Sequence, residues 1–338
     1  MSTKVSDYDN RFALRWIDLA QARLGGEVLY ATDDFFAEKE NLIKPGRGIF
    51  IEDKYTENGK WMDGWESRRK RVEGHDYAVL KLGLSGVIKG FDIDTNHFLG
   101  NHPPHASVEA CCLPAGQSPD FHDDSQWTEI LTKSELAPGS QNFFEISSQQ
   151  RWTHLRLHIY PDGGVARLKV HGIVQPDWEN IPQEEILDFL AVQNGGMAVI
   201  CNDMFFSSKE NLIMPGRGVN MGDGWETRRR REPGNDWIIL SLGHRCIGET
   251  VLIDTAHFKG NYPDRFDLWG ADLSAEKDEI NLESYSSWKP VISQTKLEAN
   301  NILELSNLEN NGPFTHLKMN IYPDGGVSRL RFFGRKSI

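Results

Sequence analysis

The chain has 338 residues, of which 39% are hydrophobic, so it is long enough for two ordinary globular domains with cores of their own. With 37 lysines and arginines against 49 aspartates and glutamates, its net charge of −12 opposes condensation onto a phosphate backbone, and we expect no nucleic-acid partner. The sequence lacks an apolar run near the roughly 18 residues of a membrane span and a signal-peptide core. We therefore expect a soluble, cytoplasmic protein that does not bind membranes.

The first predicted element is a short helix within residues 11–26, "RFALRWIDLAQARLGG", and a second short helix is predicted to begin near Pro182. Proline suits a first helical position, and paired glycines can stop a helix. The apolar stripe and the stop of the second helix are Ile186, Leu187, Leu190, Gly195 and Gly196.

The sequence that follows the first helix is repeated in the second half of the chain. "FFAEKENLIKPGRG" (35–48) returns 170 positions later as "FFSSKENLIMPGRG" (205–218). "DGWESRR" returns as "DGWETRR" after only 160 positions, because ten residues around "IEDKYTENGK" (51–60) are inserted in the first copy. "DIDTNHFLGNHP" and "HLRLHIYPDGGVARL" then return as "LIDTAHFKGNYP" and "HLKMNIYPDGGVSRL". We predict two homologous domains, residues 1–172 and 173–338.

Short alternating runs dominate each repeat, for example "YAVLKL" (77–82) and "WIILSL" (237–242). Across 154–159 apolar and polar side chains alternate, as they do on the two faces of a strand. "PDGG" is typical of a turn between strands. The pattern predicts an all-β protein made of two tandem jelly-roll β-sandwich domains, each preceded by its short helix.

The motif "PGRG" carries the first candidate binding residues, Arg47 and Arg217. Pro-Gly alone explains a turn with a solvated arginine. Alternatively, the flanking glycines let the backbone approach a ligand whose carboxylate the guanidinium holds in bidentate fashion.

The motif "DGWE[ST]RR" gathers a glutamate and arginines in an acidic protein. Glu66 with Arg68 or Arg69 is either an ordinary surface ion pair or part of a local anion site. The counterparts in the second copy are Glu226, Arg228 and Arg229.

The element "DT.HF.GN" places a carboxylate, a hydroxyl, an imidazole and an amide within eight residues at the end of a strand. Histidine can shuttle a proton near neutral pH, and Asp94 can orient His97 or share a metal ion with it. Two ligands fall short of a metal site, and the four cysteines form no CxxC pair that would suggest zinc. In "YPDGGV.RL" the residues placed to meet a ligand are Tyr160, Arg167, Tyr322 and Arg329.

These four motifs, each present twice in the same order across nearly the whole chain, resemble the allantoicase (allantoate amidinohydrolase) family. The resemblance implies two tandem jelly rolls of the galactose-binding type, and hydrolysis of allantoate to ureidoglycolate and urea in purine (allantoin) breakdown. The ten-residue insertion in the first repeat means that a site there can differ from its counterpart.

The substrate so implied has one carboxylate and two ureido groups on a single carbon. We expect its carboxylate to be clamped by Arg47, Arg68, Arg69, Arg217, Arg228 or Arg229. We expect its ureido groups to be read by Asn101, Asn261, Glu66 or Glu226. The proposed general acid is His97 or His257, oriented by Asp94 or Asp254, while Glu66 or Glu226 activates water.

Two other classes of function stay open from the sequence. Jelly rolls of this type also bind sugars or other small molecules without chemistry, and duplicated loops can make subunit contacts. The repeated elements are rich in Arg, Asp, Glu and His rather than in aromatic stacking platforms, which favours an enzyme. We also expect a homo-oligomer, and a divalent metal ion is a further open requirement.

Overall fold

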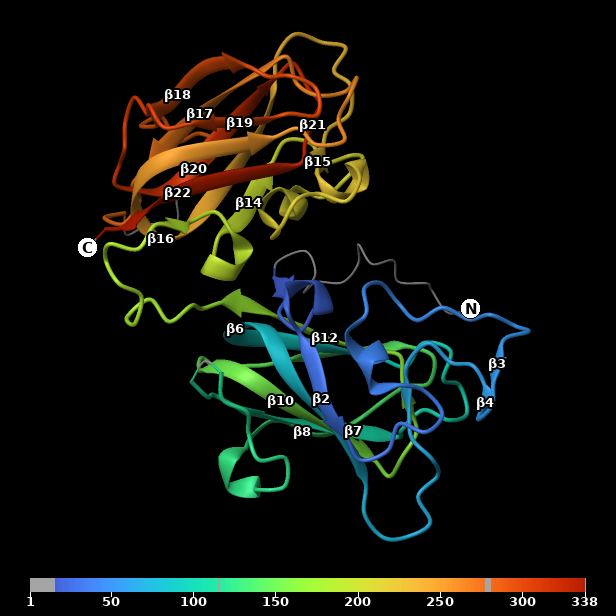
Figure 1. Cartoon of the computed structure of the whole chain (residues 1–338). Coiled ribbons are helices and arrows are strands. Elements are labelled where there is room, and N and C mark those ends of the chain that lie inside the picture. Colours follow the sequence, from blue (N-terminus) through green and yellow to red (C-terminus); the bar gives the residue numbers. More distant parts are fainter. Residues whose placement is uncertain (1–15, 115, 277–280, 338) are drawn as a thin grey trace. The chain divides into compact units, whose positions relative to one another are not determined.

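The computed structural model describes residues 16–114, 116–276 and 281–337, and the chain divides into two compact units, 1–176 and 177–338. Both units are built of antiparallel strands, and the helices among the described residues are short 3-10 turns (Figure 1). None of these helices is long and apolar enough to cross a membrane. The all-β prediction is confirmed.

The first unit contains twelve strands and three 3-10 turns in its described part. The strands are β1 (Ile17–Asp18), β2 (Glu27–Ala31), β3 (Tyr55–Thr56), β4 (Gly59–Lys60), β5 (Trp65–Glu66), β6 (Asp76–Asp94), β7 (His105–Cys111), β8 (Thr128–Glu135), β9 (Gln141–Glu145), β10 (Arg151–Tyr160), β11 (Gly164–Val165) and β12 (Arg167–Val174). The 3-10 turns are η2 (Ala22–Leu24), η3 (Lys39–Ile43) and η4 (Asp124–Gln126).

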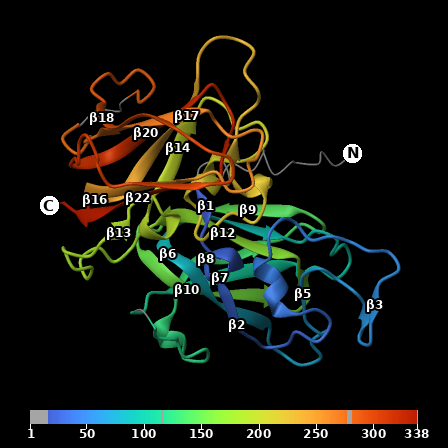
Figure 2. The same ribbon diagram turned by 45° about the horizontal axis from the view of Figure 1, so that its top comes forward.

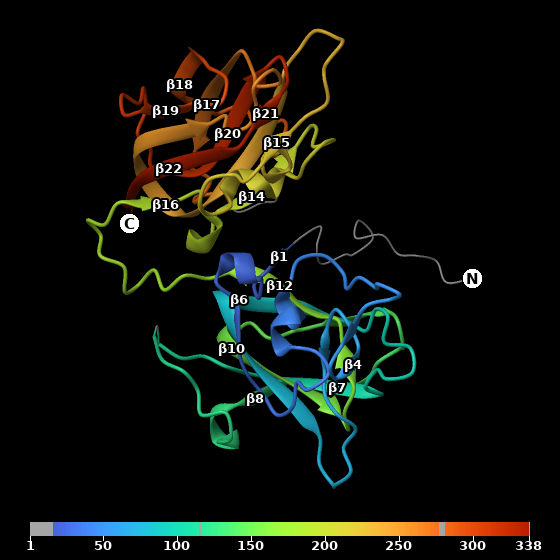
Figure 3. The same cartoon turned by 45° about the vertical axis from the view of Figure 1, so that its right-hand side comes forward.

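Among its described residues the second unit repeats this strand order without a counterpart of the β3–β4 hairpin, and it has η7 before β15 where the first unit has that hairpin before β5. Figure 3 shows its strands in the yellow-green to red part of the chain. Its strands are β13 (Leu187–Asp188), β14 (Met197–Cys201), β15 (Trp225–Glu226), β16 (Asp236–Asp254), β17 (Arg265–Ala271), β18 (Lys289–Lys296), β19 (Ile302–Leu305), β20 (Phe314–Tyr322), β21 (Gly326–Val327) and β22 (Arg329–Lys336). Its 3-10 turns are η5 (Val192–Asn194), η6 (Lys209–Ile213) and η7 (Met221–Asp223).

One long strand joins the two layers of each sandwich. The first half of β6 pairs with β2 and β10, and the sheet continues through β7 to β8. The second half of β6 pairs with β9 and with β12, which in turn pairs with β1 (Figure 2). In the second unit β16 serves both layers in the same way. The apolar side chains that alternate along these strands form the core between the layers.

The short helices predicted before each repeat are not found among the described residues, and residues 11–15 of the first one lie outside them. A two-residue strand and a single 3-10 turn stand in their place, β1 with η2 and β13 with η5. The Asp18 carboxylate accepts the backbone N–H groups of Ala20 and of Val170 in β12, which fixes the segment as an extended edge of the sheet. Asp188 does the same in the second unit. These carboxylates override the helical pattern.

The strand predicted around 154–159 is confirmed as β10, but both of its faces are buried. Leu155, Leu157 and Ile159 face the core at 0% exposure. Arg156 is also only 3% exposed, because the segment before β8 covers it and supplies the Phe121 carbonyl and the Asp124 carboxylate as its partners. The polar face of β10 is therefore covered by protein and not by solvent.

Candidate active site

Three of the duplicated motifs meet around Phe98, which is completely buried. A side chain at Gly64 would place its Cβ 2.7 Å from the Phe98 ring, and one at Gly164 would place it 2.0 Å away. Both glycines reach the same ring because β5 pairs with β11, with Trp65 opposite Val165 and Glu66 opposite Gly164. The glycines of "DGW" and "PDGG" and the phenylalanine of "HF" thus form one packing unit. That unit explains why these motifs recur together.

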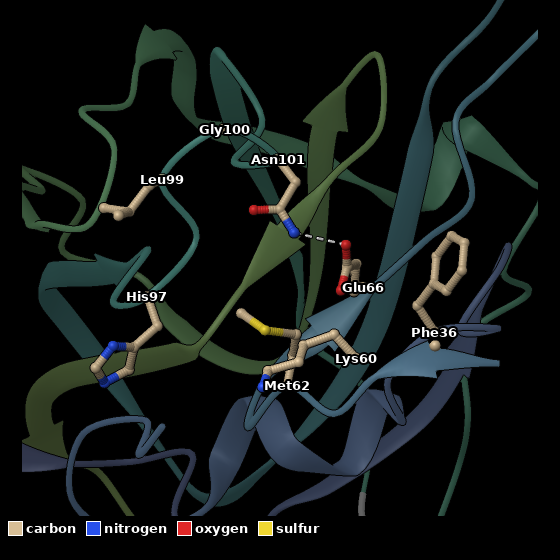
Figure 4. Close-up of a pocket in the computed structure, with 9 residues that line it drawn as sticks. Phe36, Lys60, Met62, Glu66, His97, Leu99, Gly100 and Asn101 are labelled. Atoms are coloured by element: carbon tan, nitrogen blue, oxygen red, sulfur yellow. Dashed lines mark hydrogen bonds between the residues drawn. The ribbon is translucent and has the colours of Figure 1, made fainter. Parts of the chain in front are cut away.

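This packing unit supports a pocket of about 340 Å³ at the surface of the first repeat. Its volume lies within the range of roughly 300–1,000 Å³ that is common for small-molecule sites. Figure 4 shows the residues that line it: Phe36, Gly59, Lys60, Met62, Glu66, His97, Leu99, Gly100 and Asn101.

Glu66 is the half-buried carboxylate of this pocket. Its Oε1 accepts a 2.7 Å hydrogen bond from Asn101 Nδ2, so the glutamate of "DGWE" and the asparagine of "DT.HF.GN" meet in space. Its backbone N–H donates to the Ala37 carbonyl, which fixes the side chain's starting point. Burial raises the pKa of Glu66, and the Asn101 hydrogen bond offsets part of that shift. Such a carboxylate accepts a proton more readily than an ordinary surface glutamate.

His97 lies on another side of the same pocket, on a backbone with φ of 68°. Its ring packs against Phe50, with 5.6 Å between the ring centroids. None of the residues that the structure describes hydrogen-bonds to its ring nitrogens. The Gly48 carbonyl close by is instead taken by Asn96, whose Nδ2 donates to it at 2.7 Å.

The corresponding histidine of the second repeat is used differently. His257 also has a positive φ, of 71°, but its Nε2 donates to the Gly218 carbonyl at 2.7 Å. Ala256 stands where the first repeat has Asn96 and has no amide to offer. The imidazole thus bonds the loop in the repeat that has alanine and lines the pocket in the repeat that has asparagine.

Asp94 pairs with Arg47 and not with His97. The guanidinium holds both carboxylate oxygens, at 2.8 Å through Nε and 2.9 Å through Nη2. Asp254 and Arg217 form the equivalent pair at 3.2 Å. The predicted orientation of each histidine by the aspartate three residues earlier does not occur. The pair instead links the "PGRG" loop to the end of the long strand.

The arginines that follow Glu66 and Glu226 lie outside the pocket. Arg68 pairs with Asp33 at 2.6 Å and stacks over Phe35, and it is 61% exposed. In the second repeat Arg228 pairs with Asp203 and stacks over Phe205. Arg69 is exposed and does not line this pocket. Arg229 is also exposed, but it borders a separate pocket of about 490 Å³ in the second repeat, together with Arg228, Arg230 and Arg231. Alternate residues of each basic run thus form ion pairs at this loop, and the run of the second repeat also borders that separate pocket.

The residues singled out in "YPDGGV.RL" bond to other parts of their own repeats. Arg167 is 2% exposed and donates to the Asp63 carboxylate at 2.7 Å, and Arg329 pairs with Asp223 at 2.9 Å. The hydroxyl of Tyr160 bonds Ser107 at 2.9 Å. The hydroxyl of Tyr322 bonds Asp267 at 2.7 Å. None of these four residues lines the pocket of the first repeat.

The sequence matches the allantoicase repeat family over residues 17–175 and 187–337. The chain belongs to the allantoicase family. It is 49% identical over 325 residues to proteins named probable allantoicase from Pseudomonas savastanoi pv. phaseolicola and Pseudomonas syringae pv. tomato, covering 96% of this chain and 97% of each relative.

Solved structures agree with this assignment. The crystal structure of allantoicase from Saccharomyces cerevisiae is 33% identical, with a TM-score of 0.79 and coverage of 99% of this chain and 98% of that one. A second allantoicase structure is 34% identical, with a TM-score of 0.77 over 94% and 93% of the two chains. The family resemblance drawn from the motifs and the jelly-roll class are both confirmed.

Two residues that bear on the candidate chemistry were not predicted from the sequence: Lys60, which lines the pocket, and Asn96, which bonds the Gly48 carbonyl close to His97. Lys60 lies at the end of the ten-residue insertion, which the comparison of repeats had marked as the place where the copies differ. Asn96 stands opposite an alanine within an otherwise shared motif. Both residues stand where the two copies differ, whereas the motifs consist of the positions that the copies share.

A metal site is not evident from the side chains that the structure describes. In residues 16–114, 116–276 and 281–337, no group of three or more His, Cys, Asp or Glu side chains is arranged to hold a metal ion. Asp94, one of the two candidate ligands, is engaged by Arg47.

Proposed function

We propose that the pocket of the first repeat is where this protein hydrolyses allantoate, with Glu66 as general base and His97 as general acid. Membership of the allantoicase family makes the chain a hydrolase that converts allantoate and water to ureidoglycolate and urea in purine catabolism. A jelly roll that only binds small molecules is not favoured by that membership. What remains to be assigned is the repeat and the residues that act.

The reaction breaks one C–N bond at the carbon that carries the carboxylate. Glu66 takes a proton from water, and the oxygen of that water forms the new C–O bond. His97 gives a proton to the urea nitrogen that leaves, because urea departs poorly as an anion. If urea leaves first, the retained ureido nitrogen also loses its N–H proton to form the C=N bond, and it takes a proton back when water adds to that imine. Proton exchange with solvent then returns Glu66 to its ionised form and His97 to its protonated form.

The observation that carries this proposal is the availability of His97. Its ring nitrogens have no hydrogen-bond partner among the described residues, and it lines the same pocket as Glu66, on a different side (Figure 4). The second repeat retains the contact between Glu226 and Asn261, but the Gly218 carbonyl binds its histidine. A histidine that donates to a backbone carbonyl is restrained from delivering that proton to a leaving group.

The test compares matched substitutions in the two repeats. Release of urea and ureidoglycolate would be measured for Glu66→Gln and His97→Asn beside Glu226→Gln and His257→Asn. We expect the first pair to lower kcat by about 100-fold or more, the usual contribution of a positioned acid or base, and the second pair to stay within about threefold. Loss confined to the second pair would assign catalysis to the other repeat.

The other expectations from the sequence stay predictions. These are a homo-oligomer, a cytoplasmic location and the absence of nucleic-acid binding. Dialysis against a chelator, followed by addition of Mn²⁺ or Mg²⁺, tests the requirement for a metal through loss and recovery of turnover.

A further inference from the structure

We propose that Lys60, which the inserted hairpin of the first repeat delivers to the pocket, binds the substrate carboxylate and so determines both specificity and which repeat is active. This inference rests on the proposed function of that pocket. It concerns a residue that no motif of the family resemblance pointed to.

The hairpin holds Lys60 in a defined place. Strands β3 and β4 pair Tyr55 with Lys60 and Thr56 with Gly59, and the hairpin projects from the rest of the first repeat (Figures 1 and 2). Asn58 at its turn donates to the Phe35 carbonyl at 2.9 Å, which ties the hairpin to the loop beside the pocket. Lys60 therefore belongs to an ordered element and not to a free loop.

The ammonium group of Lys60 has aromatic neighbours. It lies 4.6 Å from the centroid of the Tyr55 ring and 4.9 Å from that of Phe50. Phe50 also packs against His97, so Lys60 and His97 both contact the same aromatic ring. Aromatic faces attract a cation without neutralising it. Among the residues that the structure describes, no carboxylate lies within ion-pair distance of Lys60.

The arginines expected to clamp the carboxylate differ from Lys60 in this respect. Arg47 is held by both oxygens of Asp94, Arg68 pairs with Asp33, and neither lines the pocket. A substrate carboxylate would have to displace a protein carboxylate from either of them. Displacing an existing charge-assisted pair offsets most of what the new pair contributes. Lys60 can bind the substrate anion without that exchange.

The second repeat lacks this cation. Its sequence has no counterpart of residues 51–60, and Met221 occupies the neighbourhood instead, with its sulfur 3.8 Å from Asn261 Nδ2. The glutamate–asparagine pair is thus present in both repeats, whereas the lysine is present in one. An anionic substrate is expected to bind where that pair and a cation occur together.

The experiment compares Lys60→Gln with Lys54→Gln. Lys54 belongs to the same hairpin and carries the same charge, but its ammonium lies over Trp61, 3.6 Å from the ring centroid, and it does not line the pocket. We expect Lys60→Gln to raise KM about 10- to 100-fold with a smaller change in kcat, as for loss of one hydrogen bond to a charged group. Lys60→Arg should recover part of this loss, and Lys54→Gln should stay within about twofold.

A binding measurement separates a change in affinity from a change in chemistry. Calorimetry with the Glu66→Gln background should show allantoate binding that weakens by a similar factor when Lys60→Gln is added. Binding of the neutral carboxamide analogue of allantoate should not change. Thermal unfolding of each variant checks that the hairpin substitution leaves the fold intact.

The outcomes distinguish a failure of the role proposed for Lys60 from a failure of the proposed function. If Glu66→Gln and His97→Asn are inactive while Lys60→Gln keeps the kcat/KM of the unmodified protein, this inference is overturned and the proposed function stands. If Glu66→Gln and His97→Asn turn over normally, the proposed function itself fails. Equal weakening of allantoate and its carboxamide would also overturn the role of Lys60 as the carboxylate partner.

Discussion

The two repeats are alike where they hold the scaffold together and different where the first one forms its pocket. Phe98 packs against two glycines, and Phe258 does the same in the second repeat. The buried ion pair of Arg167 with Asp63 is likewise repeated by Arg329 with Asp223. Many of the residues that the two copies share therefore stabilise the fold of each repeat. The side chains proposed for the chemistry also have counterparts in the second repeat, and the surroundings of that site differ in the inserted hairpin and in the exchange of Asn96 for Ala256.

The largest effect that we expect is on stability, and it should be equal in the two repeats. Asp63→Ala leaves the buried guanidinium of Arg167 without its carboxylate, and Asp223→Ala does the same to Arg329. Each change should lower the free energy of unfolding of its own repeat by about 3–5 kcal/mol, the usual effect of breaking a buried pair. Chemical denaturation would measure it. A loss below about 1 kcal/mol in either repeat would contradict a shared scaffold role.

The next effect distinguishes the repeats by pH. Burial and the nearby charge of Asp94 raise the pKa of Asp92 to about 7, from 3.8, and its Oδ1 is buried without a hydrogen-bond partner. The folded state therefore holds this proton more tightly than the unfolded chain, so the contribution of Asp92 to stability is lost as pH rises from 3.8 to about 7. The second repeat has Leu252 at this position, which cannot titrate.

Asp92→Asn removes the titration and keeps an oxygen for the hydrogen bond from Gln141. At pH 8 we expect the variant to be more stable than the unmodified protein by on the order of 4 kcal/mol, and near pH 3 the two should be equal. Thermal unfolding across this range is the measurement. A variant that is less stable at pH 8 would show that the carboxylate is favoured in the folded state, contrary to the raised pKa.

A smaller effect is expected where the repeats differ by one side chain. Asn96→Ala leaves the Gly48 carbonyl open to His97, as Ala256 leaves Gly218 open to His257. Turnover should fall about tenfold, because a hydrogen bond of this strength holds the imidazole in the inactive orientation most of the time. Ala256→Asn should leave turnover unchanged. Full activity of Asn96→Ala would mean that the position does not control His97.

The smallest expected effect is a shift in the pH profile. Glu66 must be ionised to act as a base, and its raised pKa places the acid limb of kcat/KM above the range of an ordinary glutamate. Asn101→Leu removes the hydrogen bond that favours the ionised form, so the limb should move to higher pH. Asn261→Leu should not move it. A shift to lower pH would contradict Glu66 as the base.

Much of the fold followed from the sequence because alternation and duplication are local signals. The strands around 77–82, 237–242 and 154–159 were found from their alternating pattern, and the spaced motifs led to the family. The prediction of a helix before each repeat was wrong. Asp18 and Asp188 each accept a hydrogen bond from a strand that is distant in sequence, and this contact holds the segment extended. The hydrophobic pattern within a segment carries no information about hydrogen-bond partners elsewhere in the chain.

The candidate site was predictable only in part. Glu66, His97 and Asn101 were named from the motifs, and the structure brings all three to one pocket. The partner of Asp94 could not be found, because an aspartate near a histidine and an arginine 47 residues away has two possible partners and only the folded chain selects one. Lys60 was missed because its role depends on where an insertion folds back.

The most direct test of the account is a crystal structure of the Glu66→Gln variant with allantoate. We predict that the substrate occupies the pocket of the first repeat, with its carboxylate within hydrogen-bond distance of Lys60 Nζ and one ureido nitrogen toward His97. Substrate bound in the second repeat, or bound in the first with its carboxylate on Arg47 or Arg68, would contradict it.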